Sequence, residues 1–346
     1  MTKIFFISLI IFSFRINAQT NDTLTITGVG DIMMGSNYPN GGTLPPNGGS
    51  DLMKSVKSIL SSSDITFGNL EGTLLDKGGI AKTCRDPKVC YVFRTPESYV
   101  KNLVDAGFDV MSVANNHSAD FGWEGKVKTE KMLESAGINF AGQATNPSAI
   151  FEKNGIKYGF AAFAPNTGCA NINDLIAAKK IVRRLDSLCD VVIVSFHGGA
   201  EGPQYQHVTR KTELFYGENR GNVYDFAHQM IDAGADILLG HGPHVTRAVE
   251  VYRNRFIAYS LGNFCTYGGI NVSGVSGLSP IVTVYTDKKG KFLKAKVTST
   301  YQQFLSNVMI DPQNQVLKRI QQLTREDFAE KKLIIDDSGW IKSSGN

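Results

Sequence analysis

Short, nearly continuous apolar runs alternate along the chain with longer segments of helical periodicity. The runs are too short for helices and are typical of strands that are buried on both faces. Three junctions, at 105–110, 135–140 and 232–237, share one order: a helix that ends at glycine, then Asp or Asn, then an apolar strand. This alternation predicts βαβ units, and therefore an α/β fold in which helices cover a parallel sheet.

The same pattern gives the expected elements along the whole chain. The expected strands are 24–29, 65–67, 110–114, 140–141, 158–164, 191–196, 237–239, 248–252, 256–260, 281–285 and 292–299. The expected helices are 51–60, 96–106, 123–136, 173–188, 223–233 and 312–323. The last four strands leave no room for helices within their pairs and are expected to form two hairpins. No change in composition marks a linker, so residues 19–346 are predicted to form a single domain.

The first 18 residues have the features of a secretory signal peptide. Lys3 precedes the apolar run 4–14, and Ala18 is a small residue at a plausible cleavage position. This run is shorter than the roughly 20 apolar residues that span a bilayer, so an uncleaved membrane anchor is the less favoured alternative. We therefore expect the mature chain to be exported to the periplasm, the cell surface or the medium.

Charge and cysteine content narrow the possible partners and covalent links. Cleavage after residue 18 would lower the formal net charge from +4 to +2, and no basic cluster contains interleaved aromatic residues, so nucleic acid is not an expected partner. Export permits disulfide bonds. Cys84 and Cys90 flank a loop-like segment and are the first expected pair, whereas Cys169 and Cys189 are the second, which leaves Cys265 free.

Polar side chains collect where the predicted strands end, which is where open α/β sheets bind ligands. The residues at these ends are Asp31, Asn69, Glu71, Asn115, Asn116, His117, Asp120, His197, Glu201, His241 and His244. Four of the six histidines lie at such positions, and only His207 and His228 do not. Any one of these residues could merely cap a turn, but together they predict a shared metal site, since imidazole and carboxylate are common metal ligands.

Two other kinds of site do not fit the sequence. Gly28 and Gly30 follow a strand as in a dinucleotide-binding loop, but Met33 stands where the third glycine is needed. The Gly-x-Ser-x-Gly elbow of serine hydrolases does not occur.

Six segments, in order along the chain, resemble the bacterial CapA family of poly-γ-glutamate capsule synthesis proteins. These segments are 28–35 (GVGDIMMG), 69–72 (NLEG), 114–122 (ANNHSADFG), 196–199 (FHGG), 240–244 (GHGPH) and 259–264 (YSLGNF), within a region of about 24–300 that leaves 301–346 as a C-terminal helix and tail. The family is related to calcineurin-like metallophosphoesterases. The resemblance therefore implies a four-layer α-β-β-α sandwich of the metallophosphoesterase type, with a dinuclear site for divalent ions such as manganese, magnesium, iron or zinc.

The resemblance also implies roles for individual residues. The implied metal ligands are Asp31, Glu71, Asn116, His197, His241 and His244. His117 matches the histidine that protonates a leaving group, and Asp120 is expected to orient it. The sequence departs from the metallophosphoesterases at Met33, where they have a histidine, and in the two residues that separate His241 from His244. Both departures concern the same implied metal.

The expected function is that of an exported, metal-dependent hydrolase in the biosynthesis or processing of poly-γ-glutamate or a related cell-surface polymer. Arg94 is expected to hold an anionic substrate, with a surface position at a helix start as the alternative, and Glu201 to bind substrate, support His197 or lie exposed. The bond that is cleaved is an amide or a phosphoester, and membrane-bound capsule synthesis machinery is a candidate partner. Two alternatives remain open: a general phosphoesterase acting on nucleotides or phosphate esters, and a non-catalytic subunit for polymer binding or export.

Overall fold

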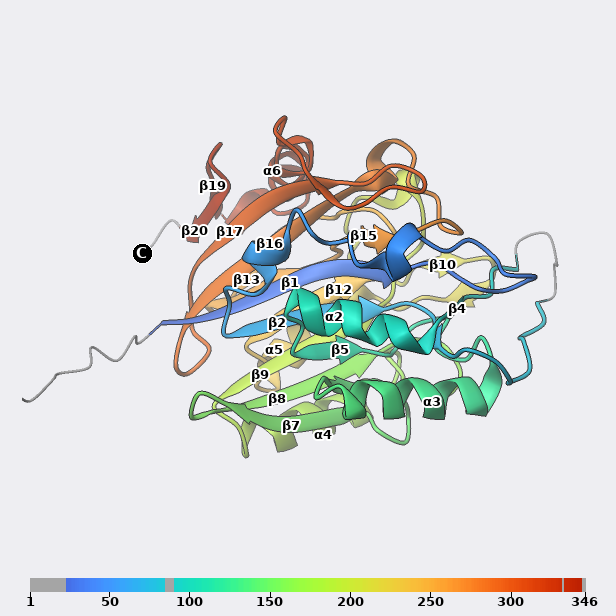
Figure 1. Ribbon diagram of the computed structural model, residues 1–346. Coiled ribbons are helices and arrows are strands. Elements are labelled where there is room, and N and C mark those ends of the chain that lie inside the picture. The colour runs from blue at the N-terminus through green and yellow to red at the C-terminus, as the bar shows by residue number, and fades with distance from the viewer. Residues whose placement is uncertain (1–22, 85–89, 332, 344–346) are drawn as a thin grey trace, which may run out of the picture.

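Two large β-sheets dominate the computed structural model, which describes residues 23–84, 90–331 and 333–343 (Figure 1). The ten-stranded sheet has the order β19 (Leu333–Ile335), β20 (Trp340–Ser343), β17 (Phe292–Tyr301), β16 (Leu278–Asp287), β1 (Thr23–Met33), β2 (Ile65–Leu70), β5 (Val110–Ser112) and β6 (Asn139–Ala141), with β15 (Asn263–Thr266) beside β1 and β18 (Met309–Ile310) beside β17. The six-stranded sheet has the order β13 (Val249–Tyr252), β14 (Arg255–Ala258), β12 (Ile237–His241), β9 (Val191–His197), β8 (Ile156–Phe163) and β7 (Ser148–Lys153). Two short ribbons pair β3 (Thr73–Leu74) with β4 (Arg94–Thr95), and β10 (Leu214–Phe215) with β11 (Glu218–Asn219).

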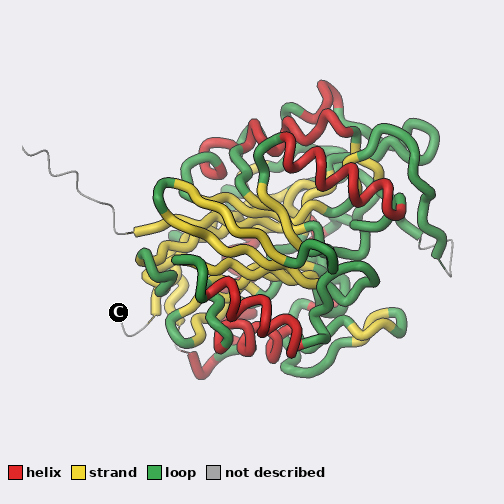
Figure 2. Tube along the Cα trace, turned by 90° about the horizontal axis from the view of Figure 1, so that it is seen from below, coloured by secondary structure: helices red, strands yellow, loops and turns green. Residues whose placement is uncertain are grey.

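Helices cover the outer faces of both sheets, so the strands lie between two helical layers (Figure 2). The ten-stranded sheet carries α1 (Lys57–Leu60), α2 (Val100–Ala106) and α3 (Gly122–Ser135), and the six-stranded sheet carries α4 (Leu175–Asp186) and α5 (Val223–Asp232). The last helix, α6 (Gln315–Asp327), packs against β16, β17 and β13. Short 3₁₀ turns occupy Pro46–Gly49, Glu97–Tyr99, Pro203–Tyr205, Gly274–Gly277 and Ala329–Lys331.

Alternate residues of the central strands face two different hydrophobic cores. In β9, Val191 and Ile193 belong to the core between the two sheets, whereas Val192 and Val194 pack with the helices outside. Side chains alternate faces along a strand, and a strand with helices on one face and a sheet on the other is apolar at every position. This packing explains the continuous apolar runs of the sequence and confirms the four-layer sandwich.

The arrangement of parallel strands brings the predicted polar positions to one edge. Strands β1, β2 and β5 are mutually parallel in one sheet, as are β9 and β12 in the other. Asp31 is in register with Asn69, and His197 with His241. Each sheet therefore delivers its strand-end side chains in neighbouring pairs.

The predicted helix 51–60 is largely wrong, because only Lys57–Leu60 is α-helical. In an α-helix the carbonyl of Leu52 would accept a hydrogen bond from the N–H of Val56. Here the N–H of Val308 donates to Leu52 O (2.9 Å), and the N–H of Val56 turns to Met53 O (3.1 Å). A residue some 250 positions later, in the connection between two strands, thus forms a hydrogen bond with the Leu52 carbonyl that an α-helix would use.

The strand predictions hold, but the sheets are mixed rather than parallel. Both predicted hairpins, β13–β14 and β16–β17, are confirmed as antiparallel pairs. The sequence did not predict strands β7, β15, β19 and β20, nor the two-residue strands β3, β4, β10, β11 and β18. The first of these has no fully buried residue and pairs antiparallel with β8 at the sheet edge, so it lacks the apolar run that marks the inner strands.

One of the two expected disulfide bonds is present. Cys84 is bonded to Cys90, and Cys265 is free as predicted. The pairing of Cys169 with Cys189 is wrong, since both are free thiols. They lie in different cores, Cys169 between the sheets and Cys189 on the helical side of the six-stranded sheet.

The N-terminal prediction cannot be compared with this fold, since the expected signal peptide lies outside the described residues. Among residues 23–84, 90–331 and 333–343, no helix has the length and apolar character needed to cross a bilayer.

Candidate functional site

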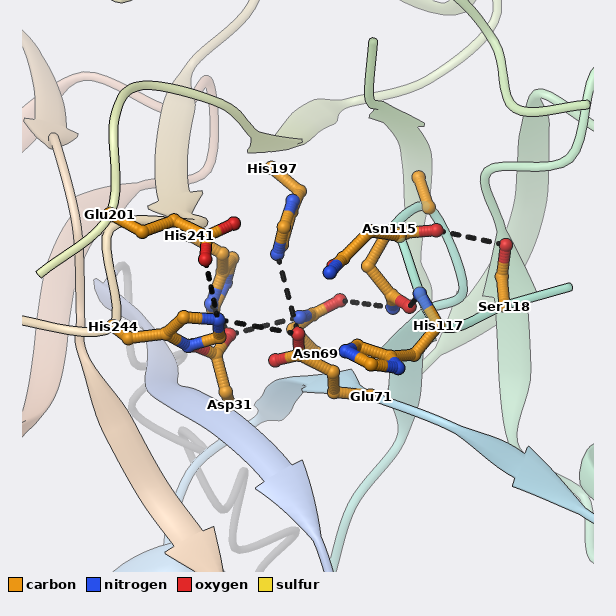
Figure 3. Close-up of polar contacts among 12 residues, drawn as sticks. Asp31, Asn69, Glu71, Asn115, His117, Ser118, His197, Glu201, His241 and His244 are labelled. Atoms are coloured by element: carbon orange, nitrogen blue, oxygen red, sulfur yellow. Dashed lines mark hydrogen bonds and ion pairs between the residues drawn. The ribbon is translucent and has the colours of Figure 1, made fainter. Parts of the chain in front are cut away.

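Asp31 is fully buried and has hydrogen-bond partners on both carboxylate oxygens (Figure 3). Its Oδ1 accepts a hydrogen bond from Asn69 Nδ2 (2.9 Å) and lies 3.1 Å from His241 Nδ1, while its Oδ2 lies 3.0 Å from His244 Nδ1. Burial alone would raise the pKa of Asp31, but the hydrogen bonds and charges of the two histidines hold that pKa below its ordinary value. Asp31 is therefore a carboxylate that orients two imidazoles.

Asn263 fixes the tautomer of His244, and sequence reasoning missed it. The amide Nδ2 of Asn263 donates to the main-chain carbonyls of His244, Asn271 and Ser276 (3.1–3.3 Å). Its Oδ1 therefore faces His244 Nδ1, at 3.0 Å. Because Asp31 and Asn263 both present acceptors to this nitrogen, the proton resides on Nδ1, which leaves Nε2 for the site. The available clue was the position of Asn263 within the segment 259–264.

Glu71, His197 and His244 bring ligand atoms together from three strand ends. Glu71 Oε1 lies 3.6 Å from His197 Nε2 and 3.6 Å from His244 Nε2, and ligand atoms of the three residues all lie within 4.8 Å of one another. Both carboxylate oxygens of Glu71, both ring nitrogens of His197 and Nε2 of His241 are buried without a hydrogen-bond partner in the described structure. Buried polar groups are normally satisfied. This donor set fits a divalent cation, which these atoms would ligate.

Electrostatics within this group favour the same conclusion. Burial raises the pKa of Glu71 to about 7, although the charge of His244 acts in the opposite direction. Burial, reinforced by the charge of Arg220, lowers the pKa of His197 well below its ordinary value, so this imidazole is neutral. Burial would lower the pKa of His244 too, but the negative charges of Glu71, Asp31 and Glu201 raise it to about 10. A cation in this position would replace the charge of that imidazolium.

The His117 imidazole is paired with a buried carboxylate and a lysine. His117 Nδ1 lies 2.8 Å from Asp120 Oδ2, which also accepts a hydrogen bond from Phe93 N–H (2.6 Å). Lys82 Nζ lies 2.6 Å from Asp120 Oδ1 and 3.4 Å from His117 Nδ1. The Phe93 ring packs on the imidazole at a centroid distance of 4.3 Å. The structure thus brings the predicted pair His117–Asp120 together and adds Lys82, which lies in a loop and has no strand-end pattern to identify it.

A chain of buried amides connects this pair to Asp31 (Figure 3). Asn69, which donates to Asp31, accepts a hydrogen bond from Asn115 Nδ2 (3.1 Å), and Asn115 Oδ1 accepts from His117 N–H (3.1 Å). The side chain of the next residue, Asn116, is half-buried, and its Oδ1 is buried with no hydrogen-bond partner within residues 23–84, 90–331 and 333–343. Asn116 therefore has the free amide oxygen that a ligand needs, and its role stays a prediction.

The two predicted substrate-binding residues have different surroundings. The Arg94 guanidinium packs over the rings of Tyr38 (5.5 Å) and Phe121 (5.0 Å), while its Nε donates to Asn37 Oδ1 (2.6 Å). Arg94 is thus clamped in one orientation by two aromatic rings rather than lying free at a helix start.

Glu201, by contrast, reaches the histidine cluster. Its Oε1 lies 2.8 Å from Nη2 of the buried Arg220, and its Oε2 lies 4.0 Å from His244 Nε2. Burial would raise the pKa of Glu201, but the charges of His244 and Arg220 outweigh this effect and lower it. Arg220, like Asn263 and Lys82, is a residue that the sequence did not indicate.

Backbone shape brings these strand ends into contact. Gly242 has a φ of +112°, and a Cβ there would lie 2.7 Å from Gly198 N, so the loop after β12 packs directly on the loop after β9. His244 has a φ of 56°, a left-handed conformation that costs a non-glycine residue roughly 1–3 kcal/mol. Such strain is typical of residues that are held in place for function. Met33, where the metallophosphoesterase resemblance implies a histidine, is 1% exposed and its methyl group packs near Gly269.

The fold and this edge define a class of protein: an α/β sandwich with buried carboxylate and imidazole donors at its strand ends. The chain belongs to the family described as "Bacterial capsule synthesis protein PGA_cap", which it matches over residues 25–267. The predicted family is therefore confirmed.

Three curated relatives carry names from polymer synthesis. The chain is 30% identical to "Capsule biosynthesis protein CapA" of Bacillus anthracis over 268 residues, which are 71% of this chain and 60% of that protein. It is 27% identical to "PGA biosynthesis protein CapA" of Bacillus subtilis over 271 residues, 72% of this chain and 65% of that one. It is 29% identical to a "Probable polyglutamine synthesis accessory protein" of Mycobacterium tuberculosis over 231 residues, 59% of this chain and 56% of that one. The chain thus spans less than two thirds of the length of each.

Solved structures resemble this one in fold. A hypothetical protein from Thermus thermophilus gives a TM-score of 0.50 at 16% identity, covering 81% of this chain and all of that one. A 5'-nucleotidase precursor from the same organism gives a TM-score of 0.45 at 12% identity, covering 89% of this chain and 59% of that one. At these identities the likeness concerns the fold and not the reaction.

Proposed function

We propose that this protein is an exported, metal-dependent hydrolase that acts in the synthesis or processing of poly-γ-glutamate or a related anionic cell-surface polymer. The observation that carries the proposal is the set of buried, unpartnered donors on Glu71, His197 and His241 in the described structure. Membership of the capsule synthesis family supports a polymer substrate. Export rests on the basic and apolar pattern of residues 1–18.

The ions would be held by the strand-end residues of both sheets. The proposed ligands are Asp31, Glu71, Asn116, His197, His241 and His244. A bound divalent cation supplies a Lewis acid and lowers the pKa of a bound water molecule. The protein's own contribution is orientation, since Asp31 accepts hydrogen bonds from the Nδ1 atoms of both His241 and His244 and so presents their Nε2 atoms. The ligand set combines carboxylate, amide and imidazole, which suits manganese, iron, zinc or magnesium.

His117 would hold the proton that the leaving group needs. Its Nδ1–H donates to Asp120, which leaves Nε2 as the atom that carries or releases a proton. Asp120 stabilises the protonated ring, while Lys82, 2.6 Å from Asp120, balances the carboxylate charge. Arg94, fixed between Tyr38 and Phe121, would hold an anionic group of the substrate.

The test combines metal analysis with two substrates. Purified protein is expected to contain or bind manganese, and with manganese to cleave poly-γ-glutamate, followed by chain length and new amino groups. Cleavage of an aryl phosphate instead would favour the general phosphoesterase. His117→Ala should lower the rate of cleavage by roughly 10²–10⁴-fold. His207→Ala is the matched control, because His207 is exposed and pairs with Asp327 outside the site. A protein that binds no added manganese would rule the proposal out.

A second candidate function is a non-catalytic accessory role, which the name of the Mycobacterium tuberculosis relative favours. This candidate predicts binding of the anionic polymer without cleavage of either bond. It also predicts that Asn116→Ala and His117→Ala leave function in polymer production intact, an outcome that the hydrolase does not allow.

A further inference from the structure

Glu201 faces the same ring nitrogen of His244 that Glu71 faces (Figure 3). Its Oε2 lies 4.0 Å from His244 Nε2, and Glu71 Oε1 lies 3.6 Å from that atom. Two ligands that each lie about 2.1 Å from one ion are at most about 4.2 Å apart. The distances from His244 Nε2 to Glu201 Oε2 and to Glu71 Oε1, and the 3.6 Å between Glu71 Oε1 and His197 Nε2, each fall below this limit. Glu201 is not part of the three-residue group whose ligand atoms all lie within 4.8 Å of one another, and it adjoins that group through His244.

Arg220 fixes the direction in which Glu201 points. The Arg220 side chain is 2% exposed, and its Nη2 lies 2.8 Å from Glu201 Oε1. The backbone of Arg220 is held in turn, because its carbonyl accepts a hydrogen bond from Gly199 N–H (2.9 Å) and its N–H donates to Glu213 O (2.9 Å). Oε1 of Glu201 is thus paired with an arginine whose backbone is held in place, and Oε2 is turned toward His244.

The three residues of this cluster leave at least one coordination position of a divalent cation open. Glu71, His197 and His244 supply three ligand atoms, and Met33 is packed in the interior with a thioether that suits soft rather than hard ions. Glu201 lies in the loop that follows β9, and its Oε2 is 4.0 Å from His244 Nε2.

We propose that Glu201 is a fourth ligand, through Oε2, of the divalent cation held by Glu71, His197 and His244, and that Arg220 is its positioning residue. This inference rests on the proposed metal site. It replaces the substrate-binding role predicted for Glu201 and supplies a ligand that compensates for Met33.

Metal affinity tests the assignment without reference to any substrate. Manganese binding is measured by calorimetry on the full chain and on Glu201→Ala, Arg220→Lys and Glu218→Gln. The last is the matched control, because Glu218 Oε2 lies 3.6 Å from Nη1 of the same Arg220 but is 61% exposed on its side chain. Glu201→Ala should weaken manganese binding at least tenfold, because the ion loses a ligand. Arg220→Lys acts only through Glu201, so its effect should be smaller than that of Glu201→Ala. Changes to residues that orient metal ligands typically cost roughly 10–100-fold in affinity. Glu218→Gln should stay within twofold of the wild type.

Cobalt spectroscopy separates a ligand from a mere counter-charge. At saturating cobalt, the visible absorption of Glu201→Ala should change in shape, because the ion loses a protein ligand, whereas that of Glu218→Gln should match the wild type. Circular dichroism and thermal unfolding in EDTA verify that the variants fold. If Glu201→Ala binds manganese as the wild type does, or binds more weakly with an unchanged cobalt spectrum, Glu201 is not a ligand and the proposed function still stands. If the wild type binds no metal, both proposals fail.

Discussion

Two buried clusters in this protein each combine a glutamate with histidine, but they differ in whether the glutamate has hydrogen-bond partners in the described structure. Glu71 meets His197 and His244 at the strand ends, whereas Glu250, on β13, meets His228 of α5 and Tyr259. Both glutamates are completely buried. Composition and burial alone therefore do not distinguish the two clusters.

The hydrogen bonds distinguish them. Glu250 Oε2 accepts from the Tyr259 hydroxyl (2.8 Å) and lies 2.9 Å from His228 Nε2. The His228 ring stacks on Tyr252 (3.8 Å) and contacts the tilted ring of Tyr224 (4.1 Å). The Glu71 oxygens have no hydrogen-bond partner in the part of the chain that the structure describes. A partnered cluster stabilises the fold, while an unpartnered one is costly until a ligand arrives. The difference predicts that function depends on the first cluster and stability on the second.

The largest expected effect concerns His117, the proposed proton donor beside the first cluster. His117→Ala should lower kcat for the cleaved substrate by roughly 10²–10⁴-fold, because the leaving group loses its general acid. Manganese affinity should be unchanged. His228→Gln, in the second cluster, should keep the wild-type rate, and an equal loss of rate in that variant would contradict the comparison.

The next largest expected effect is the difference in how much manganese stabilises variants of the two clusters. At a manganese concentration of 100 times Kd, the wild-type free energy of unfolding should rise by about 2.7 kcal/mol over the value in EDTA. His197→Ala should lose this increment because it removes a neutral imidazole ligand, whereas His228→Gln should retain it. Urea unfolding with and without EDTA measures both. A full increment in His197→Ala would exclude that residue from the site.

Conservative amide substitutions should act in opposite directions in the metal-free protein. Glu71→Gln removes a buried acid with no hydrogen-bond partner among the described residues, so in EDTA at pH 8 it should stabilise the fold, by roughly 1–3 kcal/mol. Glu250→Gln weakens bonds to His228 and Tyr259 and should destabilise the fold by a similar amount. The free energies come from urea unfolding. Two changes of the same sign would remove the distinction between the clusters.

The sequence predicted the members of this candidate site that lie at the ends of the expected strands. Asp31, His197 and His241 could be placed together because the carboxyl ends of parallel strands converge, and a buried strand is visible as an apolar run. Asn263, Lys82 and Arg220 could not be placed, since their roles depend on hydrogen bonds and ion pairs to residues distant in the chain.

The errors in the fold have the same origin. Local periodicity favoured a helix at 51–60, but a hydrogen bond from Val308 to Leu52 prevents it. The expectation of export permitted a Cys169–Cys189 bond, but the two thiols face opposite sides of one sheet. Periodicity predicts which side chains are buried. It does not predict which distant residue forms a hydrogen bond with a given backbone group, or on which side of the sheet a loop cysteine packs.

Proton release on metal binding is the smallest effect and the most direct measure of the first cluster's charges. In the metal-free protein the pKa of His244 is raised to about 10 and that of Glu71 to about 7. A raised pKa means that the folded state holds the proton more tightly than the unfolded state. The stability that His244 contributes is therefore fully present below about pH 6.5, its ordinary value, and is lost as the pH rises through about 10.

A cation needs both groups deprotonated, so binding must displace those protons. Calorimetry in buffers of different ionisation enthalpy should give a release of about one proton per manganese ion at pH 8, from His244, and a value nearer two at pH 6, where Glu71 is also protonated. Affinity should then fall with decreasing pH by up to about 1.4 kcal/mol per unit for each proton released. Binding without proton release at pH 8 would mean that His244 is already neutral, and the charge balance that distinguishes this cluster would be wrong.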